Sequence, residues 1–123
     1  MDNSKNNLEA RTTKFGKDII LLCRSIKFDP VTTKIIDQLV RSGTSIGANY
    51  MEAINASSKR DFKNKIFTCK KEAQETKYWL TMLSECEPDK NATISSLSQE
   101  CHEFNLIFQK IITTMNIKEI DKW

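Results

Sequence analysis

Residues 61–83 read DFKNKIFTCKKEAQETKYWLTML, and this stretch decides the fold. Its apolar and small side chains recur at alternating intervals of four and three residues, at positions 62, 66, 69, 73, 76, 80 and 83. An α-helix brings such positions onto one face. A sustained period of about 3.5 residues is typical of helices that pack side by side at about 20°. The stretch therefore predicts a long helix over about 59–85 with one continuous buried seam.

Three further helices follow from the same kind of pattern. A second seam at positions 94, 97, 101, 104, 108, 111 and 115 predicts a helix over about 90–117. Two helices are predicted upstream, over about 12–27 and 32–56, and Asp29-Pro30 separates them because the residue before proline is pushed out of the helical region. Ser58, with Asp61 three residues later, is a typical helix start. Short connections make neighbours antiparallel, so the sequence predicts an all-α, up-down-up-down antiparallel four-helix bundle.

Composition predicts a single domain over residues 1–123, with residues 1–10 as a flexible tail. The chain is 39% hydrophobic and 28% charged, a balance that supports an ordinary core. Its longest apolar run, Ile19–Cys23, is far shorter than the ~20 residues that span a bilayer. Residues 1–7 lack the apolar segment of a secretory signal. We therefore expect a cytoplasmic location.

The chain offers little chemistry for catalysis. Its cysteines are scattered without a C-x-x-C pair, so we expect reduced, structural thiols rather than disulfides or a zinc site. They are Cys23, Cys69, Cys86 and Cys101. The single histidine, His102, lacks the Glu-x-x-His spacing of di-metal bundles, and Gly43-x-x-x-Gly47 lacks the lysine of a phosphate-binding loop. The sequence predicts no catalytic residue, cofactor or metal site, and a protein that is not an enzyme.

Carboxylates are expected to converge between the second and third helices, because these helices should be antiparallel neighbours. Glu52 comes from the second helix, and Glu72 and Glu75 come from the third. Arg41 and Asn49 share the helix of Glu52, which favours a polar network that sets helix register or joins subunits. A carboxylate metal site is the lesser alternative, since histidine ligands are missing.

Several apolar side chains lie off the predicted seams. Phe67, Tyr78 and Trp79 do so on the third helix. The others are Leu106, Ile107, Ile112, Ile117, Ile120 and Trp123. One bundle has a single interior, so this surplus predicts self-association through exposed apolar surface. Wide apolar stripes within one subunit are the alternative.

Two glycines lie one turn apart in the second predicted helix. Gly43 and Gly47 each cost about 1 kcal/mol relative to alanine inside a helix, so close approach of a neighbour is expected to offset that cost. We expect a bulky residue to pack there, with Trp79 or Phe104 as candidates, and the site to serve packing or assembly. A local kink without further meaning is the alternative.

Three blocks of sequence carry a family resemblance. They are RSGTSIGAN at residues 41–49 with Glu52 after it, SKRDF at 58–62 and KEAQETKYWL at 71–80. In this order they resemble the 23S rRNA intervening-sequence protein family, small bacterial four-helix bundles. That family is similar to the accessory variability protein of diversity-generating retroelements. The resemblance implies a homopentamer with a nucleic-acid-related role, and RNA, DNA or a reverse transcriptase as partners.

Basic residues gather in the third predicted helix. Between Lys59 and Lys77 there are seven lysines or arginines against three acids. Five of them are candidates for contacts with nucleic-acid phosphates: Lys59, Arg60, Lys63, Lys70 and Lys77. Lys63, Lys70 and Lys77 recur every seven residues along one edge, where they would give salt-sensitive binding. A solvated face, partly neutralised by neighbouring glutamates, is the alternative, because a net charge of +3 is modest.

Together these patterns predict a non-enzymatic, homo-oligomeric bundle that binds nucleic acid electrostatically. The rival interpretation is a protein-interaction scaffold that recruits a partner such as a reverse transcriptase and has no direct nucleic-acid role.

Overall fold

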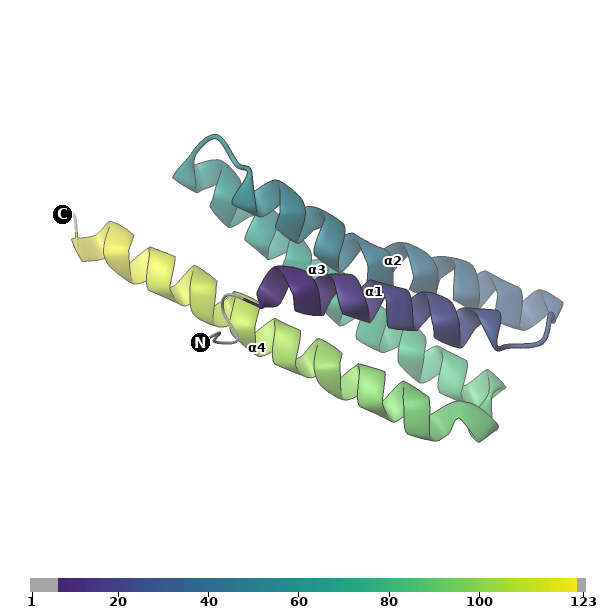
Figure 1. The fold of residues 1–123 in the computed structure, drawn as a ribbon. Helices are drawn as coiled ribbons and strands as arrows, with labels where there is room; N and C mark the ends of the chain where they lie inside the picture. The colour runs from purple at the N-terminus through teal and green to yellow at the C-terminus, as the bar shows by residue number, and fades with distance from the viewer. Residues whose placement is uncertain (1–6, 122–123) are drawn as a thin grey trace.

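Four α-helices make up the computed structural model, which describes residues 7–121, with side chains for 7–118. They are α1 (Leu8–Arg24), α2 (Pro30–Ile54), α3 (Lys59–Cys86) and α4 (Asn91–Asp121), and a short 3₁₀ turn, η1 (Pro88–Lys90), joins α3 to α4. Helices adjacent in the chain pack against each other, and α1 also meets α4 (Figure 1). The all-α four-helix bundle predicted from the sequence is confirmed. Nothing in the described part of the chain is a strand.

Helix α1 begins four residues before the predicted position 12, at Leu8, whose side chain is buried. Residues 8–10 of the predicted tail therefore belong to the bundle, and residues 1–6 lie outside the described residues. None of the described helices combines the length and apolarity needed to cross a membrane.

Two polar residues fix the starts of α2 and α3. The Asp29 carboxylate accepts backbone N–H groups of Val31 and Thr32 at 3.1 and 3.0 Å, which lowers the pKa of Asp29. Pro30 takes the first helical position, where its missing N–H is harmless. The Ser58 hydroxyl accepts the Asp61 N–H at 3.0 Å. Helix α3 begins at the predicted residue 59, and α2 begins at Pro30, two residues before the predicted position 32.

The core is built from the seams. On α3, positions 66, 69, 73, 76, 80 and 83 are buried, and Phe62 is half-buried against them. Phe15 of α1 meets Phe104 of α4 edge-to-face, with ring centroids 5.5 Å apart. The assignment of Ile112 to the surplus was wrong, because only 2% of it is exposed and it belongs to the core. The stripe of α4 is wider than its seam, as is common in globular helices.

Both glycines of α2 face α1. A Cβ on Gly43 would stand 3.0 Å from Ile19 Cγ1, and one on Gly47 would stand 3.3 Å from the Thr12 carbonyl oxygen. The expectation of an aromatic partner, Trp79 or Phe104, was therefore wrong. The five residues between α1 and α2 bring α1 back along α2, so an aliphatic side chain and the backbone of α1 occupy the space. The glycines thus pack two helices of one subunit.

Three of the four cysteines are buried in the core. Cys23, Cys69 and Cys101 are buried, Cys86 is half-buried, and all four are free. Desolvation raises the pKa of Cys23 to about 11 and those of Cys69 and Cys101 to about 12. The three buried thiols are structural core residues, as the sequence predicted, whereas Cys86 is not part of the core.

Candidate nucleic-acid interface

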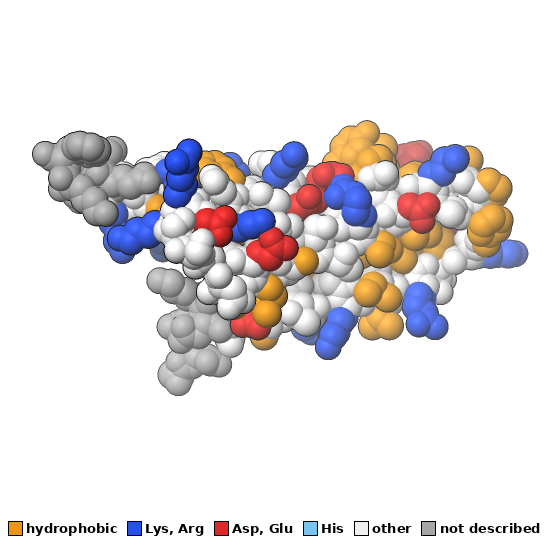
Figure 2. All heavy atoms as spheres, turned by 90° about the horizontal axis from the view of Figure 1, so that it is seen from above, with side chains coloured by type: hydrophobic (Ala, Val, Ile, Leu, Met, Phe, Trp, Pro, Cys, Tyr) orange, Lys and Arg blue, Asp and Glu red, His pale blue; other side chains and the backbone are white. Residues whose placement is uncertain are grey.

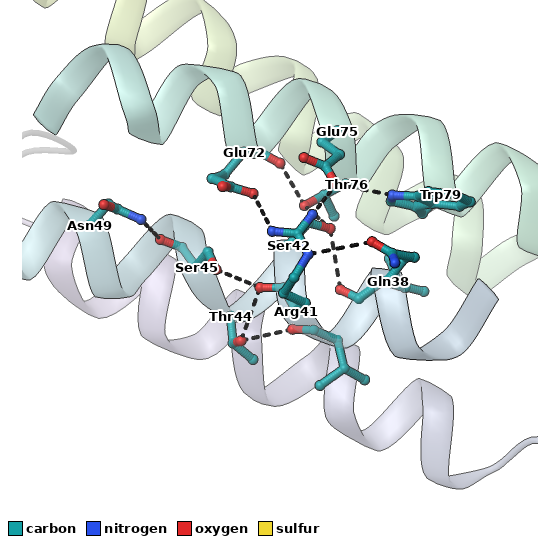
Figure 3. A network of polar contacts seen from close by, with 12 residues as sticks. Gln38, Arg41, Ser42, Thr44, Ser45, Asn49, Glu72, Glu75, Thr76 and Trp79 are labelled. Carbon is teal, nitrogen blue, oxygen red and sulfur yellow. Dashed lines mark hydrogen bonds and ion pairs between the residues drawn. The ribbon is translucent and has the colours of Figure 1, made fainter. Parts of the chain in front are cut away.

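Between Lys59 and Trp79, the acidic residues of α3 lie on the edge that faces α2, and Glu85 lies beyond this stretch, near the end of the helix. We call Asp61, Lys65, Glu72, Glu75 and Trp79 the α2-facing edge. Arg41 of α2 extends between Glu72 and Glu75, with Nη1 3.3 Å from Glu72 Oε1 and Nη2 bonded to Glu75 Oε2 (Figure 3). The Trp79 indole N–H donates to the same Glu75 oxygen at 3.3 Å. The Arg41 guanidinium therefore holds both carboxylates toward α2, and the indole, on the same helix as Glu75, orients the Glu75 carboxylate.

Only part of the predicted polar network forms. Arg41, Glu72 and Glu75 come together, whereas Asn49 turns to the Ser45 carbonyl at 2.8 Å (Figure 3). Glu52 pairs with Lys65 at 2.6 Å. Asn49 and Glu52 were wrongly included because they lie about 12 and 16 Å along α2 from Arg41, at 1.5 Å per residue. Across the described side chains, no three His, Cys, Asp or Glu residues group as metal ligands.

Asp61, the remaining acid in this part of α3, also lies on the α2-facing edge. The Lys65 pKa is raised mainly by Glu52, with a smaller contribution from Asp61. Asp61 is thus close to a lysine that is itself paired with α2. Seen from the side that α2 covers, acidic and basic side chains are interspersed (Figure 2).

The opposite side of α3 is basic. We call it the basic face and define it by Lys59, Arg60, Lys63, Phe67, Lys70, Lys71, Gln74, Lys77 and Tyr78. Helical spacing puts these positions away from both the core seam and the α2-facing edge. Lys77 acts electrostatically on Cys101 of α4, which places it toward α4. Six of the nine residues are cationic and none is acidic. All five predicted phosphate-binding residues belong to this face.

Among the described side chains of α4, the acids Glu100 and Glu103 point away from the basic face. Glu100 and Glu103 pair with Arg11 of α1 at 2.7 and 3.2 Å, and the Arg11 guanidinium stacks 5.3 Å above the Phe104 ring. The hydrogen bond to Glu100 raises the pKa of Arg11. Sequence reasoning missed this pair because nothing local links Arg11 to residues 89 and 92 positions later.

The edge of α4 opposite that pair lies toward α3. Helical spacing places His102, Asn105 and Gln109 there, and none of them is acidic. The Asn105 side-chain oxygen is buried without a hydrogen-bond partner. Over residues 102–109 of α4, the surface shared by α3 and α4 is therefore cationic on α3 and polar but uncharged on α4.

A sequence profile described as 23S rRNA-intervening sequence protein matches residues 5–110. The chain belongs to this family. A solved structure of a protein with unknown function from the S23 ribosomal protein family of Bacteroides thetaiotaomicron VPI-5482 is also similar. It is 34% identical, covers 85% of this chain and 96% of its own, and superposes with a TM-score of 0.74. The comparison with curated proteins gave no match.

In this member of the 23S rRNA-intervening sequence family, the apolar residues predicted to serve assembly differ in how far they are exposed. Tyr78 is 55% exposed and Phe67 is 46% exposed, whereas Trp79 is half-buried against the core. Leu106 and Ile117 are exposed, and Ile107 is half-buried. Ile120 and Trp123 lie outside the described side chains.

Sequence reasoning missed the most exposed apolar group. We call it the apolar end: Ile20, Leu21, Phe28 and Val31. Phe28, 78% exposed, stands in the connection between α1 and α2. Hydrophobic side chains gather at the end of the molecule where this connection lies (Figure 2). An off-seam signal was present, because Ile20 and Leu21 fall between seam residues of α1.

Proposed function

We propose that this protein is a non-enzymatic, self-associating bundle that binds nucleic acid through the basic face of α3. The observation that supports it is the separation of charge on one helix. Six cations lie on the basic face, while Asp61, Glu72 and Glu75 lie on the α2-facing edge. A surface that carries cations and no anions neutralises phosphates and releases their counterions, whatever the base sequence.

Local charge, rather than net charge, supports this proposal. The chain as a whole carries only +3. The cations from Lys59 to Lys77 nevertheless span about 27 Å, at a rise of 1.5 Å per residue. Lys63, Lys70 and Lys77 are spaced about 10 Å apart along one line of that span. Glu72 and Glu75, which could otherwise neutralise neighbouring lysines of α3, are directed toward Arg41 instead.

Self-association is the second part of the proposal. The apolar end leaves Phe28, Leu21 and Val31 at 78%, 65% and 65% exposure, which favours contact with another copy. Assembly would present the basic face several times, so weak phosphate contacts would add. Five copies is the number that the family resemblance implies.

The apolar end also favours a second candidate function. It fits a scaffold that holds a partner protein, such as a reverse transcriptase, through hydrophobic contact. In that case the basic face would be a solvated surface. The two candidates differ in whether purified protein binds nucleic acid alone.

Fluorescence anisotropy with a labelled RNA or DNA over a salt series tests the proposal. For the Lys63→Glu/Lys70→Glu/Lys77→Glu variant, we expect the magnitude of the negative slope of log Kobs against log salt to fall by about 2 to 3 units, since each lost contact removes about 0.7–0.9. A matched control reverses three exposed lysines elsewhere, at Lys17, Lys27 and Lys34. The proposal fails if the wild type does not bind at low salt, or if both variants behave alike.

A further inference from the structure

We infer that the basic face selects single-stranded over duplex nucleic acid, with Phe67 and Tyr78 as positions on which unpaired bases stack. This inference rests on the proposed function, because the surrounding lysines supply the attraction to phosphate. It goes further by naming the form of nucleic acid and the residues that distinguish it.

The two rings lie on one line along α3. Phe67, Lys71, Gln74 and Tyr78 follow intervals of four, three and four residues, so they share one stripe. Phe67 is 46% exposed and Tyr78 is 55% exposed. Lys70 lies beside this stripe on the same face. Aromatic side chains alternating with cations are the composition of surfaces that bind single strands.

Tyr78 is held in place by the α2-facing edge. Its ring meets Trp79 edge-to-face, with centroids 5.0 Å apart and planes at 78°. The Trp79 indole N–H in turn bonds to Glu75, which Arg41 holds. A ring supported on one side and open on the other loses little conformational freedom when a base stacks on it.

Duplexes and single strands differ in what they offer this surface. Both present phosphates to the lysines, so both gain electrostatic attraction. In a duplex the base faces are already stacked, and rings on a convex helix cannot reach them. Unpaired bases have open faces that stack on aromatic side chains regardless of sequence. The rings therefore add affinity for one form alone.

One strand can reach both rings. Phe67 and Tyr78 are separated by 11 residues, or about 16 Å along the helix. At a stacked rise of about 3.4 Å per nucleotide, that distance corresponds to roughly five nucleotides. A 12-nucleotide strand is thus long enough to cover the site.

The test compares a labelled 12-nucleotide strand with its blunt duplex at one low salt concentration. We expect the wild type to bind the strand more tightly. The Phe67→Ala/Tyr78→Ala variant should lose about tenfold or more in affinity for the strand and less than twofold for the duplex. Leu106→Ala, which truncates a 59% exposed apolar residue on α4, is the matched control and should change neither.

Conservative variants keep the result interpretable if the double variant folds poorly. Tyr78→Phe retains a stacking ring and should bind like the wild type, whereas Tyr78→Leu should lose strand affinity. Equal loss for strand and duplex, or no loss, overturns the inference while leaving the lysine-based function intact. A change in sedimentation coefficient on replacing the rings also overturns it, because it assigns them to a subunit contact. Wild type that binds neither form ends both proposals.

Discussion

On the α2-facing edge of α3, Glu72 and Glu75 are tied to Arg41, and Lys65 is paired with Glu52. On the basic face of the same helix, six cations share the surface with two exposed aromatic rings and no acid. The charges of the first edge hold two helices together. On the second, Lys59, Arg60, Lys71 and Lys77 are exposed. Under the proposed function, one helix would carry a structural side and an interaction side, and single charge changes should separate the two roles.

Reversing Arg41 should have the largest effect. Arg41→Glu places three carboxylates together between α2 and α3 without a cation. Arg41 is 46% exposed and water screens the pairs, so we expect a loss of about 2 kcal/mol in the free energy of unfolding. Urea denaturation measures it, and the folded variant should still bind nucleic acid. An unchanged urea midpoint would contradict the structural role of this edge.

Reversing one charge on the basic face should do the opposite. Lys71 is exposed, and Lys71→Glu should leave the unfolding free energy within about 0.5 kcal/mol of the wild type. Affinity for a labelled strand should fall by about tenfold at low salt, because one phosphate contact is lost and a repulsion is added. If urea denaturation instead shows a loss as large as that of Arg41→Glu, the two sides do not differ in role.

Trp79 contacts Glu75 of the α2-facing edge and Tyr78 of the basic face, so its replacement should have a small effect on both stability and strand binding. Trp79→Phe removes the hydrogen bond to Glu75 and should lower the unfolding free energy by about 1 kcal/mol. Strand affinity should fall two- to threefold because Tyr78 is less firmly placed, while duplex affinity stays constant. Calorimetry and anisotropy check the two effects. An effect on duplex binding of the same size would show that Trp79 acts through general stability.

The smallest expected effect is on alkaline stability. Glu52 raises the pKa of Lys65, so this pair stabilises the folded state below the ordinary lysine pKa of 10.5 and loses its effect as pH rises through the higher folded value. Over about 2 pH units spanning that pKa, from ~9 to ~11, the free energy of unfolding of Lys65→Met should therefore fall less than that of the wild type. Lys71→Met on the basic face should follow the wild type. Identical pH profiles for all three proteins would show that the Lys65 pair contributes nothing.

Much of the fold could be predicted because its signals are local. The seam of α3, Asp29-Pro30 and Ser58 with Asp61 each act over a few residues, and the helices begin and end within four residues of the expected positions. The basic residues could also be found, since seven-residue spacing defines an edge. Which helix lies next to that edge could not be predicted, because residue spacing does not say on which side of α3 each neighbouring helix packs.

The missed contacts join distant segments. Gly43 and Gly47 signalled a close approach, but the choice of Ile19 and Thr12 over an aromatic depends on how α1 lies across α2. The Arg11 pair with Glu100 depends on the closure of the bundle between its first and last helices. Asn49 and Glu52 were grouped with Arg41 by helix identity alone, although their distance along α2 separates them.

The sequence by itself determined four helices, the start of α3, most of the buried seams and the presence of lysines at heptad spacing on α3. These features depend on backbone geometry and on hydrophobic period, which a linear pattern records. Tertiary structure alone decided that Arg41 draws Glu72 and Glu75 toward α2 and that Arg11 draws Glu100 and Glu103 toward α1. Charges interact through space rather than along the chain, so the partners of these glutamates were fixed only when the helices packed.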